Sequence, residues 1–294
     1  MRNAIFLKIQ NIIIRKKKQL KLAKDRRLKQ LKLAKDRRLK QLKLEKDRRE
    51  KQLLPSQKYK TIYFNKIRNI APPQIDIKWT LNPTTLTCCI VEPRIMQELR
   101  GVLYNIANIY GNTKDVGLVI FHGTKNESFV KNIVKEWKNV VLYNLNKENL
   151  KIREYSNLLT TRTFYDHFTS SHVLIFQSDS YIFHPISQIY YTFDYVGAPW
   201  CAKIGNGCGN GGISLRKVET MKKLTNQNGV NIPEDVYFSK QNMNLCTDDT
   251  SIHQQFSVEG RFHSNPNCCH KPYQSMNNNL ENTEDYMTFL NKII

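Results

Sequence analysis

Acidic side chains at two places in the sequence have the chemistry to act on a bound ligand. Asp179 directly follows the apolar part of the segment IFQSDS, and a carboxylate there suits a divalent cation with oxygen ligands. Glu234 and Asp235 follow Pro233, and Asp235 has the chemistry of a general base. Plainer interpretations exist, because aspartate is common in turns and acidic residues in a first helical turn complement the helix dipole.

Between these acids lies a glycine-rich segment, GNGCGNGGISLR, which runs from Gly205 to Arg216. Glycine permits unusual backbone angles and a close approach of a ligand. No Gly-Lys-Ser/Thr follows, so the segment is not a P-loop, and it comes too late in the chain for a dinucleotide fingerprint. The preceding YVGAPW ends at Trp200, whose ring either packs in a corner or stacks on a sugar.

A histidine near the end of the chain is a further candidate for chemistry. His270 follows Cys268 and Cys269, but this spacing fits no usual zinc site, and we favour His270 joining Asp179 on one cation. The chain has seven cysteines, and its first apolar stretch fits neither a signal peptide nor a bilayer span. We therefore expect reduced thiols and a cytoplasmic protein.

The segments that must position these residues alternate between strand and helix patterns. This alternation predicts an α/β fold with a mostly parallel sheet and helices on both faces. Ligands bind such sheets at the carboxyl ends of the strands. The candidate polar residues at those ends are Glu92, Arg94, His122 and Asp179. We expect strands at Leu86–Glu92, Val116–His122, Val140–Leu145 and His172–Gln177, and helices at Ile95–Ile109, Glu127–Lys138 and Ser156–Phe168.

The first 54 residues are a basic tail that holds 21 of the 46 Lys and Arg residues and five of the 25 Asp and Glu residues. The tail therefore carries most of the net charge of +21. KQLKLAKDRRL recurs every 11 residues, and its good helix formers predict a long helix ending before Pro55. Its thin leucine stripe argues against a tight coiled coil and favours a solvated helix. Binding to an anionic membrane or to nucleic acid are the alternatives.

The domain organisation follows from these composition shifts. Residues 55–80, with Pro72 and Pro73, have the polar composition of a linker. We therefore expect a basic helical tail at 1–54, a linker at 55–80 and an α/β domain at 81–294.

Taken in order, eight short segments of the domain resemble a GT-A-like glycosyltransferase domain family of unknown function found in giant viruses, bacteria and fungi. The segments are VEPR, FHGTKN, IFQSDS, YVGAPW, GNGGISLR, EDVYFS, FSVE and HKP, and they cover about Leu86 to Tyr273. The resemblance implies a GT-A-like fold, a nucleotide-sugar donor, a glycan or protein acceptor and Mn²⁺ or Mg²⁺. It also adds a viral factory or virion as an alternative location to the cytoplasm.

The resemblance further implies roles for single residues. Inverting GT-A enzymes hold the metal with a DxD motif, and the aligned triplet here is QSD, so Asp179 would be the ligand and Gln177 replaces the first acid. His270 resembles the late metal-ligating histidine of that fold. Asp235 resembles the base that takes the acceptor proton, and Glu234 resembles the residue that orients the acceptor. The implied donor contacts are Glu92, Arg94, His122 and Gln177, and the implied acceptor contacts are Trp200, Asn210, Gly211 and Gly212.

The leading hypothesis is a metal-dependent glycosyltransferase with Asp235 as general base. An inverting mechanism suits a single base, and the sequence leaves a retaining mechanism open. The alternative hypothesis is a non-catalytic carbohydrate- or nucleotide-binding module on the same fold, which Gln177 favours. A third hypothesis is a nucleic-acid-associated protein that binds through its tail.

Overall fold

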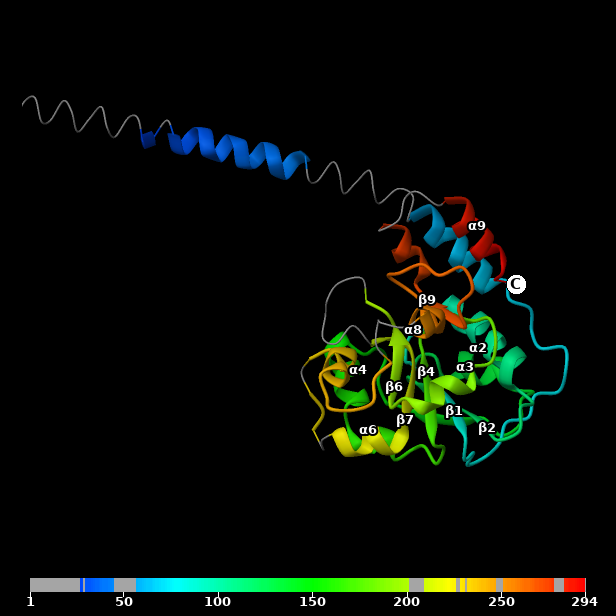
Figure 1. Cartoon of the computed structure of the whole chain (residues 1–294). Coiled ribbons are helices and arrows are strands. Elements are labelled where there is room, and N and C mark those ends of the chain that lie inside the picture. Colours follow the sequence, from blue (N-terminus) through cyan, green and yellow to red (C-terminus); the bar gives the residue numbers. More distant parts are fainter. Residues whose placement is uncertain are drawn as a thin grey trace, which may run out of the picture. The chain divides into compact units, whose positions relative to one another are not determined.

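The computed structural model describes residues 27–28, 30–44, 57–200, 209–225, 228–230, 232–246, 251–277 and 283–293. The chain divides into two compact units, Met1–Leu54 and Pro55–Ile294, and each is described by itself (Figure 1). Among the described helices, none is both long and apolar enough to cross a bilayer.

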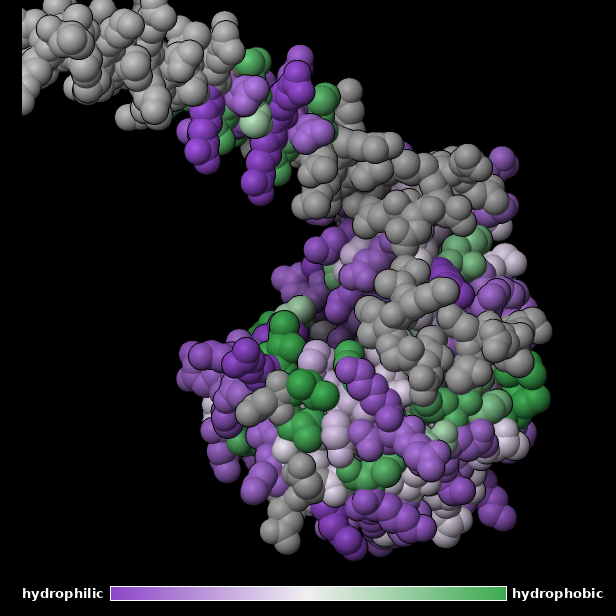
Figure 2. Space-filling model, turned by 60° about the vertical axis from the view of Figure 1, so that its left-hand side comes forward, coloured by the Kyte–Doolittle hydropathy of each residue, from purple (hydrophilic) through white to green (hydrophobic). Residues whose placement is uncertain are grey.

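In the first unit, residues 30–44 are helical, in agreement with the helix that the 11-residue repeat predicts. Every described side chain of this helix is exposed, and Leu31 and Leu42, one repeat apart, are 62% and 53% exposed. Hydrophobic and hydrophilic side chains are interleaved along the helix in Figure 2. The remainder of the predicted tail helix lies outside the described residues.

The second unit is built on a six-stranded sheet with the order β3-β2-β1-β4-β7-β6. Strands β1 to β4 run parallel, whereas β7 pairs antiparallel with β4 and β6 pairs antiparallel with β7. A three-stranded sheet, β5-β9-β8, lies alongside. The strands are β1 (Leu86–Glu92), β2 (Val116–His122), β3 (Val141–Asn144), β4 (His172–Phe176), β5 (Ser180–Ile182), β6 (Tyr195–Ala198), β7 (Asn210–Lys217), β8 (Ser257–Val258) and β9 (Cys268–His270).

Helices cover both faces of the large sheet, which confirms the predicted α/β class. Strand β1 shows this directly, because Cys88 and Ile90 enter one hydrophobic core and Cys89 and Val91 enter the other. In Figure 1, α2 and α3 lie to one side of the sheet, and α4 and α6 lie to the other. The helices are α2 (Gln97–Tyr110), α3 (Glu127–Ile133), α4 (Ile152–Leu159), α5 (Arg162–Tyr165), α6 (Val218–Leu224), α7 (Glu234–Ser239), α8 (Ser251–Phe256) and α9 (Thr283–Asn291), and the 3₁₀ helices are η1 (Gln188–Thr192) and η2 (Pro272–Asn277).

The segment expected to be a linker contains a packed helix instead. Residues 57–68 are helical, and Tyr59, Tyr63 and Ile67 on this helix are buried. Their spacing of four residues places them on one face, where they join the core shared with α2 and α9. The ring of Tyr59 packs edge-on against Tyr286 of α9, with centroids 4.9 Å apart. The polar residues between them face outward, which is why the composition resembles a linker.

The predicted helices are less accurate than the predicted strands. The helix predicted over Glu127–Lys138 ends at Ile133, and the one predicted over Ser156–Phe168 is two short helices, α4 and α5. The break between α4 and α5 has a local cause. The hydroxyl of Thr160 donates to the carbonyl of Ser156, and the side chain of Thr161 caps α5 by accepting from the backbone N–H of Phe164.

Candidate functional site

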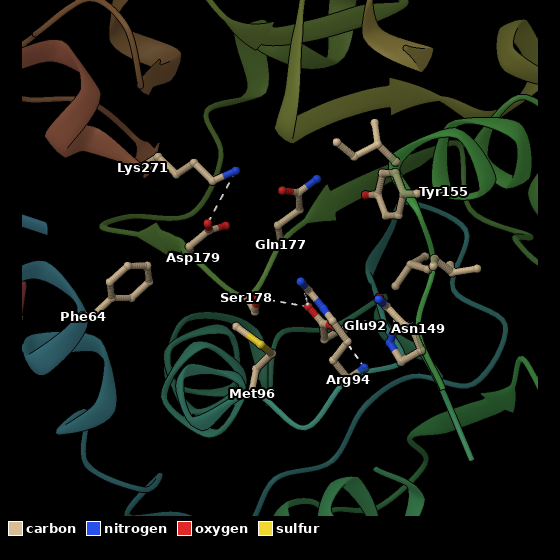
Figure 3. Close-up of a pocket in the computed structure, with 14 residues that line it drawn as sticks. Phe64, Glu92, Arg94, Met96, Asn149, Tyr155, Gln177, Ser178, Asp179 and Lys271 are labelled. Carbon is tan, nitrogen blue, oxygen red and sulfur yellow. Dashed lines mark hydrogen bonds and ion pairs between the residues drawn. The ribbon is translucent and has the colours of Figure 1, made fainter. Parts of the chain in front are cut away.

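A pocket of about 320 Å³ opens between the carboxyl ends of β1 and β4, where the order of the strands in the sheet reverses. From β1 the chain adds β2 and β3 on one side and β4 on the other, so this is the switch point at which α/β sheets bind ligands. The pocket contains four residues that the sequence analysis selected and several that it did not (Figure 3). Its lining includes Phe64, Glu92, Arg94, Met96, Asn149, Tyr155, Gln177, Ser178, Asp179 and Lys271.

At the end of β1, Glu92 and Arg94 form a paired unit. Arg94 donates from Nε to Glu92 Oε1 at 2.8 Å and from Nη2 to Oε2 at 2.7 Å, a bidentate geometry. Ser178, beyond the end of β4, donates its hydroxyl to Glu92 Oε2 at 3.1 Å. Glu92 is buried, whereas the Arg94 side chain is 51% exposed. The carboxylate therefore anchors a guanidinium that still faces the pocket.

The loop after β2 supports this pair and explains where His122 lies. Asn126 donates from Nδ2 to the backbone carbonyls of Glu92 and Arg94, at 2.7 and 2.9 Å. It also accepts from the backbone N–H of Gly123 at 2.8 Å. His122 is buried, with Nδ1 3.0 Å from the carbonyl oxygen of Gly123, and it does not line the pocket. The predicted donor contact of His122 therefore has no support from its position.

At the end of β4, Asp179 lies among basic side chains, as the pairing of β5 with β9 requires. Its Oδ1 lies 3.0 Å from Nε2 of His270, and its Oδ2 lies 3.5 Å from Nζ of Lys271. The other nitrogen of His270, Nδ1, lies 3.0 Å from Oε2 of Glu259. The backbone carbonyl of Asp179 accepts from the hydroxyl of Tyr63 at 2.8 Å. The structure thus brings Asp179 and His270 together, as the sequence analysis expected.

These contacts shift the protonation of both partners. Burial alone would raise the pKa of Asp179, but His270 and Lys271 outweigh burial and hold that pKa well below its ordinary value. Burial alone would lower the pKa of His270, but the carboxylates of Glu259 and Asp179 outweigh it and raise that pKa to about 9. The cluster therefore carries alternating charges at neutral pH.

The residues around Asp179 do not make a protein cage for a divalent cation. Mn²⁺ and Mg²⁺ need several oxygen or nitrogen ligands in near-octahedral geometry. Within the described ranges, no group of three or more His, Cys, Asp and Glu side chains is arranged to hold a metal ion. The atoms of Asp179 and His270 that could bind a metal lie within ion-pair distance of other charged groups, since His270 has a carboxylate on each side and Lys271 lies near the second oxygen of Asp179. Gln177 takes the place of the acid that would complete a DxD pair.

The glycine pair at the start of β7 lies between this cluster and the second acidic group. A side chain at Gly212 would collide with the ring of His270, and a side chain at Gly211 would collide with Oε1 of Glu234. The carbonyl of Gly212 accepts from the backbone N–H of Gln177 at 3.0 Å, which joins β7 to the pocket lining. Gly211 and Gly212 therefore allow the strand to pass between His270 on one side and α7 on the other.

Asp235, in the first turn of α7, lies against this strand. Its Oδ2 accepts from the backbone N–H of Gly211 at 3.4 Å, and its Oδ1 accepts from the N–H of Val236 at 2.7 Å. Burial and the neighbouring Glu234 raise the pKa of Asp235 to about 6. A carboxylate with a pKa close to neutrality is well suited to accept a proton.

Glu234, which the sequence analysis expects to orient the acceptor, makes contacts within the protein. It is buried, and its Oε2 accepts from the hydroxyl of Ser156 at 3.2 Å. Its Oε1 lies 3.4 Å from Nη2 of Arg216, a fully buried guanidinium. The Arg216 guanidinium packs over the rings of Tyr195 and Phe238, 5.1 and 5.5 Å from their centroids. Glu234 therefore holds α7 to the sheet, and its negative charge acts on Asp235.

The remaining predicted acceptor contacts lie outside the pocket lining. Trp200 is buried and immediately precedes residues 201–208, which are outside the described part of the chain. Asn210 accepts from the backbone N–H of Gly212 through Oδ1 at 2.9 Å. The acceptor roles of Trp200, Asn210, Gly211 and Gly212 remain predictions, and of these four residues Gly211 is the one that contacts Asp235, through its backbone N–H.

Sequence reasoning missed the residues that reach the pocket from distant segments. Phe64 comes from the helix at 57–68, and Asn149 and Tyr155 come from the segment around the start of α4. Lys271 immediately follows His270 in the segment HKP. The sequence does not show that its side chain points into the pocket. Its backbone adopts a left-handed conformation, with φ of 44°, which no pattern in the sequence predicts.

Comparisons with known families cover part of this architecture. Residues 139–270 match a family described as a protein of unknown function (DUF5672). That segment contains β4, the glycine-rich segment, α7 and His270, but not β1 with Glu92 and Arg94. No sequence among curated proteins matches the chain significantly.

Solved structures that resemble this chain include a mannosyltransferase and TarS. A mannosyltransferase from Pyrobaculum calidifontis in complex with GDP-Man and Mn²⁺ is 13% identical and has a TM-score of 0.40, covering 64% of this chain and 59% of that chain. TarS (residues 1–349) from S. aureus is 10% identical with a TM-score of 0.36, covering 53% of this chain and 54% of that one. The chain thus spans little more than half of the length of these structures.

Proposed function

We propose that the protein is a glycosyltransferase that moves a sugar from a nucleotide-sugar donor to an acceptor hydroxyl. One observation carries the proposal: a pocket at the switch point of the sheet presents two cationic side chains, Arg94 and Lys271, and the neighbouring strand β7 contacts Asp235 of α7, a carboxylate of raised pKa. The cations suit the diphosphate of a donor, and the carboxylate suits the proton of an acceptor.

The pocket offers complementary surfaces for the parts of such a donor. Phe64 and Tyr155 provide aromatic surface for a nucleobase, and Asn149 provides an amide that can hydrogen-bond to polar edges. In the view of Figure 3, Gln177 lies between Tyr155 and the pair of Asp179 and Lys271. We assign Arg94 and Gln177 to donor binding, in agreement with the sequence analysis, and add Lys271.

The proposed reaction is a direct displacement with inversion. Asp235 accepts the proton of the acceptor hydroxyl, and the oxygen attacks the anomeric carbon of the donor sugar. The bond from that carbon to the phosphate oxygen breaks, and the nucleoside diphosphate leaves with the bonding electron pair. The proton ends on the Asp235 carboxylate, whose pKa of about 6 allows both uptake and later release near neutral pH.

The proposal is tested by measuring nucleotide release from a panel of sugar nucleotides by the full chain. Each donor is assayed with Mn²⁺, with Mg²⁺ and with a chelator, because the predicted metal requirement is part of the question. Release from one donor supports a transferase and identifies its sugar. Binding of a nucleotide sugar by calorimetry without any release, across a set of glycan and peptide acceptors, supports the non-catalytic binding module instead.

The basic tail makes a separate contribution in this proposal. The exposed cations and exposed leucines of residues 30–44 suit an anionic membrane surface better than a nucleobase, because the repeat contains no aromatic residue. Removing residues 1–54 should abolish salt-sensitive binding to anionic vesicles while leaving nucleotide release unchanged. Retention of vesicle binding after the truncation would assign it to the second unit.

A further inference from the structure

We propose that Lys271 is the built-in cation that holds the diphosphate of the donor, so that donor binding does not require a divalent metal ion. This inference rests on the proposed function and specifies how the site handles the leaving group. The sequence predicts a metal site at Asp179 and His270, but the ligand atoms that the structure places there do not fit a divalent cation.

The backbone places Lys271 against Asp179 at a conformational cost. Lys271 has a φ of 44°, in the left-handed region that a non-glycine residue rarely adopts. Its backbone N–H donates to the carbonyl of Asp179 at 3.3 Å, and its side chain, 31% exposed, lines the pocket. Strained residues of this kind persist only where the surroundings fix them, and they concentrate at functional sites.

The ammonium of Lys271 stands where a divalent cation would bind the carboxylate of Asp179. Nζ lies 3.5 Å from Oδ2, while Oδ1 is occupied by Nε2 of His270 at 3.0 Å. The hydroxyl of Tyr63 fixes the backbone of Asp179 from the other side. The carboxylate therefore orients a fixed positive charge toward the pocket, and both of its oxygens are in use without a metal ion.

A second cation completes the arrangement from the other strand. Arg94 follows β1, and its guanidinium is held by both oxygens of Glu92 and is half exposed. Figure 3 shows Arg94 and Lys271 on different sides of the same pocket. In this view Ser178 and Asp179 lie between them. Two anchored cations from the ends of β1 and β9 can therefore contact the two phosphates of one donor.

The chemical step makes use of this charge. When the bond between the anomeric carbon and the phosphate oxygen breaks, the electron pair stays on that oxygen. The Lys271 ammonium donates a charge-assisted hydrogen bond to the oxygen and keeps its own protons, so it stabilises the departing diphosphate without transferring a proton. The step is neither an oxidation nor a reduction, and the acceptor proton goes to Asp235.

The experiment measures binding of nucleoside diphosphates, UDP and GDP first, to the full chain by calorimetry, with a chelator and with Mn²⁺. We expect the dissociation constant in chelator to lie within about twofold of the value in Mn²⁺. Lys271→Met, which keeps the length of the side chain, should weaken binding in chelator by about 10- to 100-fold, the range for a charge-assisted hydrogen bond. Lys271→Arg should restore most of the affinity. Lys131→Met on α3, whose ammonium is paired with Glu127 and is 60% exposed, is the control and should bind like wild type.

The outcomes separate this inference from the proposed function. Binding and nucleotide release that occur only with Mn²⁺ would overturn the inference and leave the glycosyltransferase intact. Equal affinity of wild type and Lys271→Met in chelator would also overturn it. No binding of any nucleoside diphosphate or sugar nucleotide under either condition would overturn the proposed function itself. If Lys271→Met does not fold, the comparison of chelator with Mn²⁺ in wild type and in Lys271→Arg decides the question.

Discussion

Asp179 and Asp235 are partly buried aspartates on two sides of the glycine pair of β7, and their surroundings push their pKa values in opposite directions. Asp179 lies beside His270 and Lys271, and its pKa is held well below the ordinary value. Asp235 is raised to about 6 by burial and by the neighbouring Glu234. The same residue type is therefore a fixed anion at one end of the site and a carboxyl group that titrates near neutral pH at the other.

The difference comes from which elements meet at each carboxylate. The pairing of β5 with β9 brings two basic side chains to Asp179. Near Asp235, the charge of Arg216 is paired with Glu234 instead. The second oxygen of Glu234 accepts from the hydroxyl of Ser156. A carboxylate next to positively charged groups stays ionised, whereas a carboxylate next to another acid gains a proton more easily. Three variants, Asp235→Asn, Asp179→Ala and Tyr63→Phe, and the pH profile of turnover test this difference.

The largest expected effect is on turnover by Asp235→Asn. The amide cannot accept a proton, so kcat for nucleotide release in the presence of acceptor should fall by about 10²- to 10⁴-fold. The dissociation constant of the donor should change by less than about twofold, because Asp235 does not line the donor pocket. Asp166→Asn, an exposed surface change, is the control. Unchanged turnover would remove Asp235 from the role of base.

The next effect is on stability, through Asp179→Ala. The change leaves His270 and Lys271 without the carboxylate between them, and breaking a buried ion pair from one side costs about 3 kcal/mol. Chemical denaturation at pH 7 should show this loss in the free energy of unfolding. A loss below about 1 kcal/mol would mean that the cluster at Asp179 is solvated and contributes little.

The opposite stability effect is expected at the other carboxylate. Since the pKa of Asp235 is higher in the folded chain than its ordinary value of 3.8, its ionisation opposes folding, and the cost grows as pH rises from about 4 to above 6. Asp235→Asn removes this cost and should raise the free energy of unfolding by up to about 3 kcal/mol at pH 7. The gain should vanish at pH 4, where wild type is protonated. An equal gain at both pH values would contradict the assigned pKa.

The smallest effect concerns the helix at residues 57–68. Tyr63→Phe removes the hydroxyl that donates to the carbonyl of Asp179 and should cost about 1 kcal/mol of stability. Tyr59→Phe, on the same helix and packed on Tyr286, is the matched control for the loss of a hydroxyl. Thermal unfolding of the two variants makes the comparison. A larger loss in Tyr59→Phe would show that this helix does not support the site through Tyr63.

The sequence was sufficient to predict the four parallel strands and to place Glu92, Arg94 and Asp179 at their carboxyl ends. Leu86–Glu92 and Val116–His122 were predicted with the bounds that the structure shows, because parallel strands buried on both faces are continuous apolar runs. Glu92, Arg94 and Asp179 follow from the same reasoning, since the carboxyl ends of neighbouring strands meet at one edge.

The parts that could not be predicted depend on contacts between distant segments. The helix at residues 57–68 is rich in polar residues and is followed by Pro72 and Pro73, a composition typical of a linker. The four-residue spacing of Tyr59, Tyr63 and Ile67 is the only sign of a buried face in the sequence of this segment. The direction of Lys271 depends on a left-handed backbone. The pairing of Glu234 with Arg216 depends on α7 packing on β7, and without it Glu234 looks as available as Asp235.

The pH dependence of nucleotide release at saturating donor and acceptor tests the central claim most directly. With Asp235 as the base and a pKa of about 6, kcat should fall tenfold for each pH unit below 6 and reach a plateau above it. The residual activity of Asp235→Asn should lack that slope, while donor affinity in both proteins stays level across the same range. A flat profile in wild type, or the same slope in wild type and variant, would contradict the account.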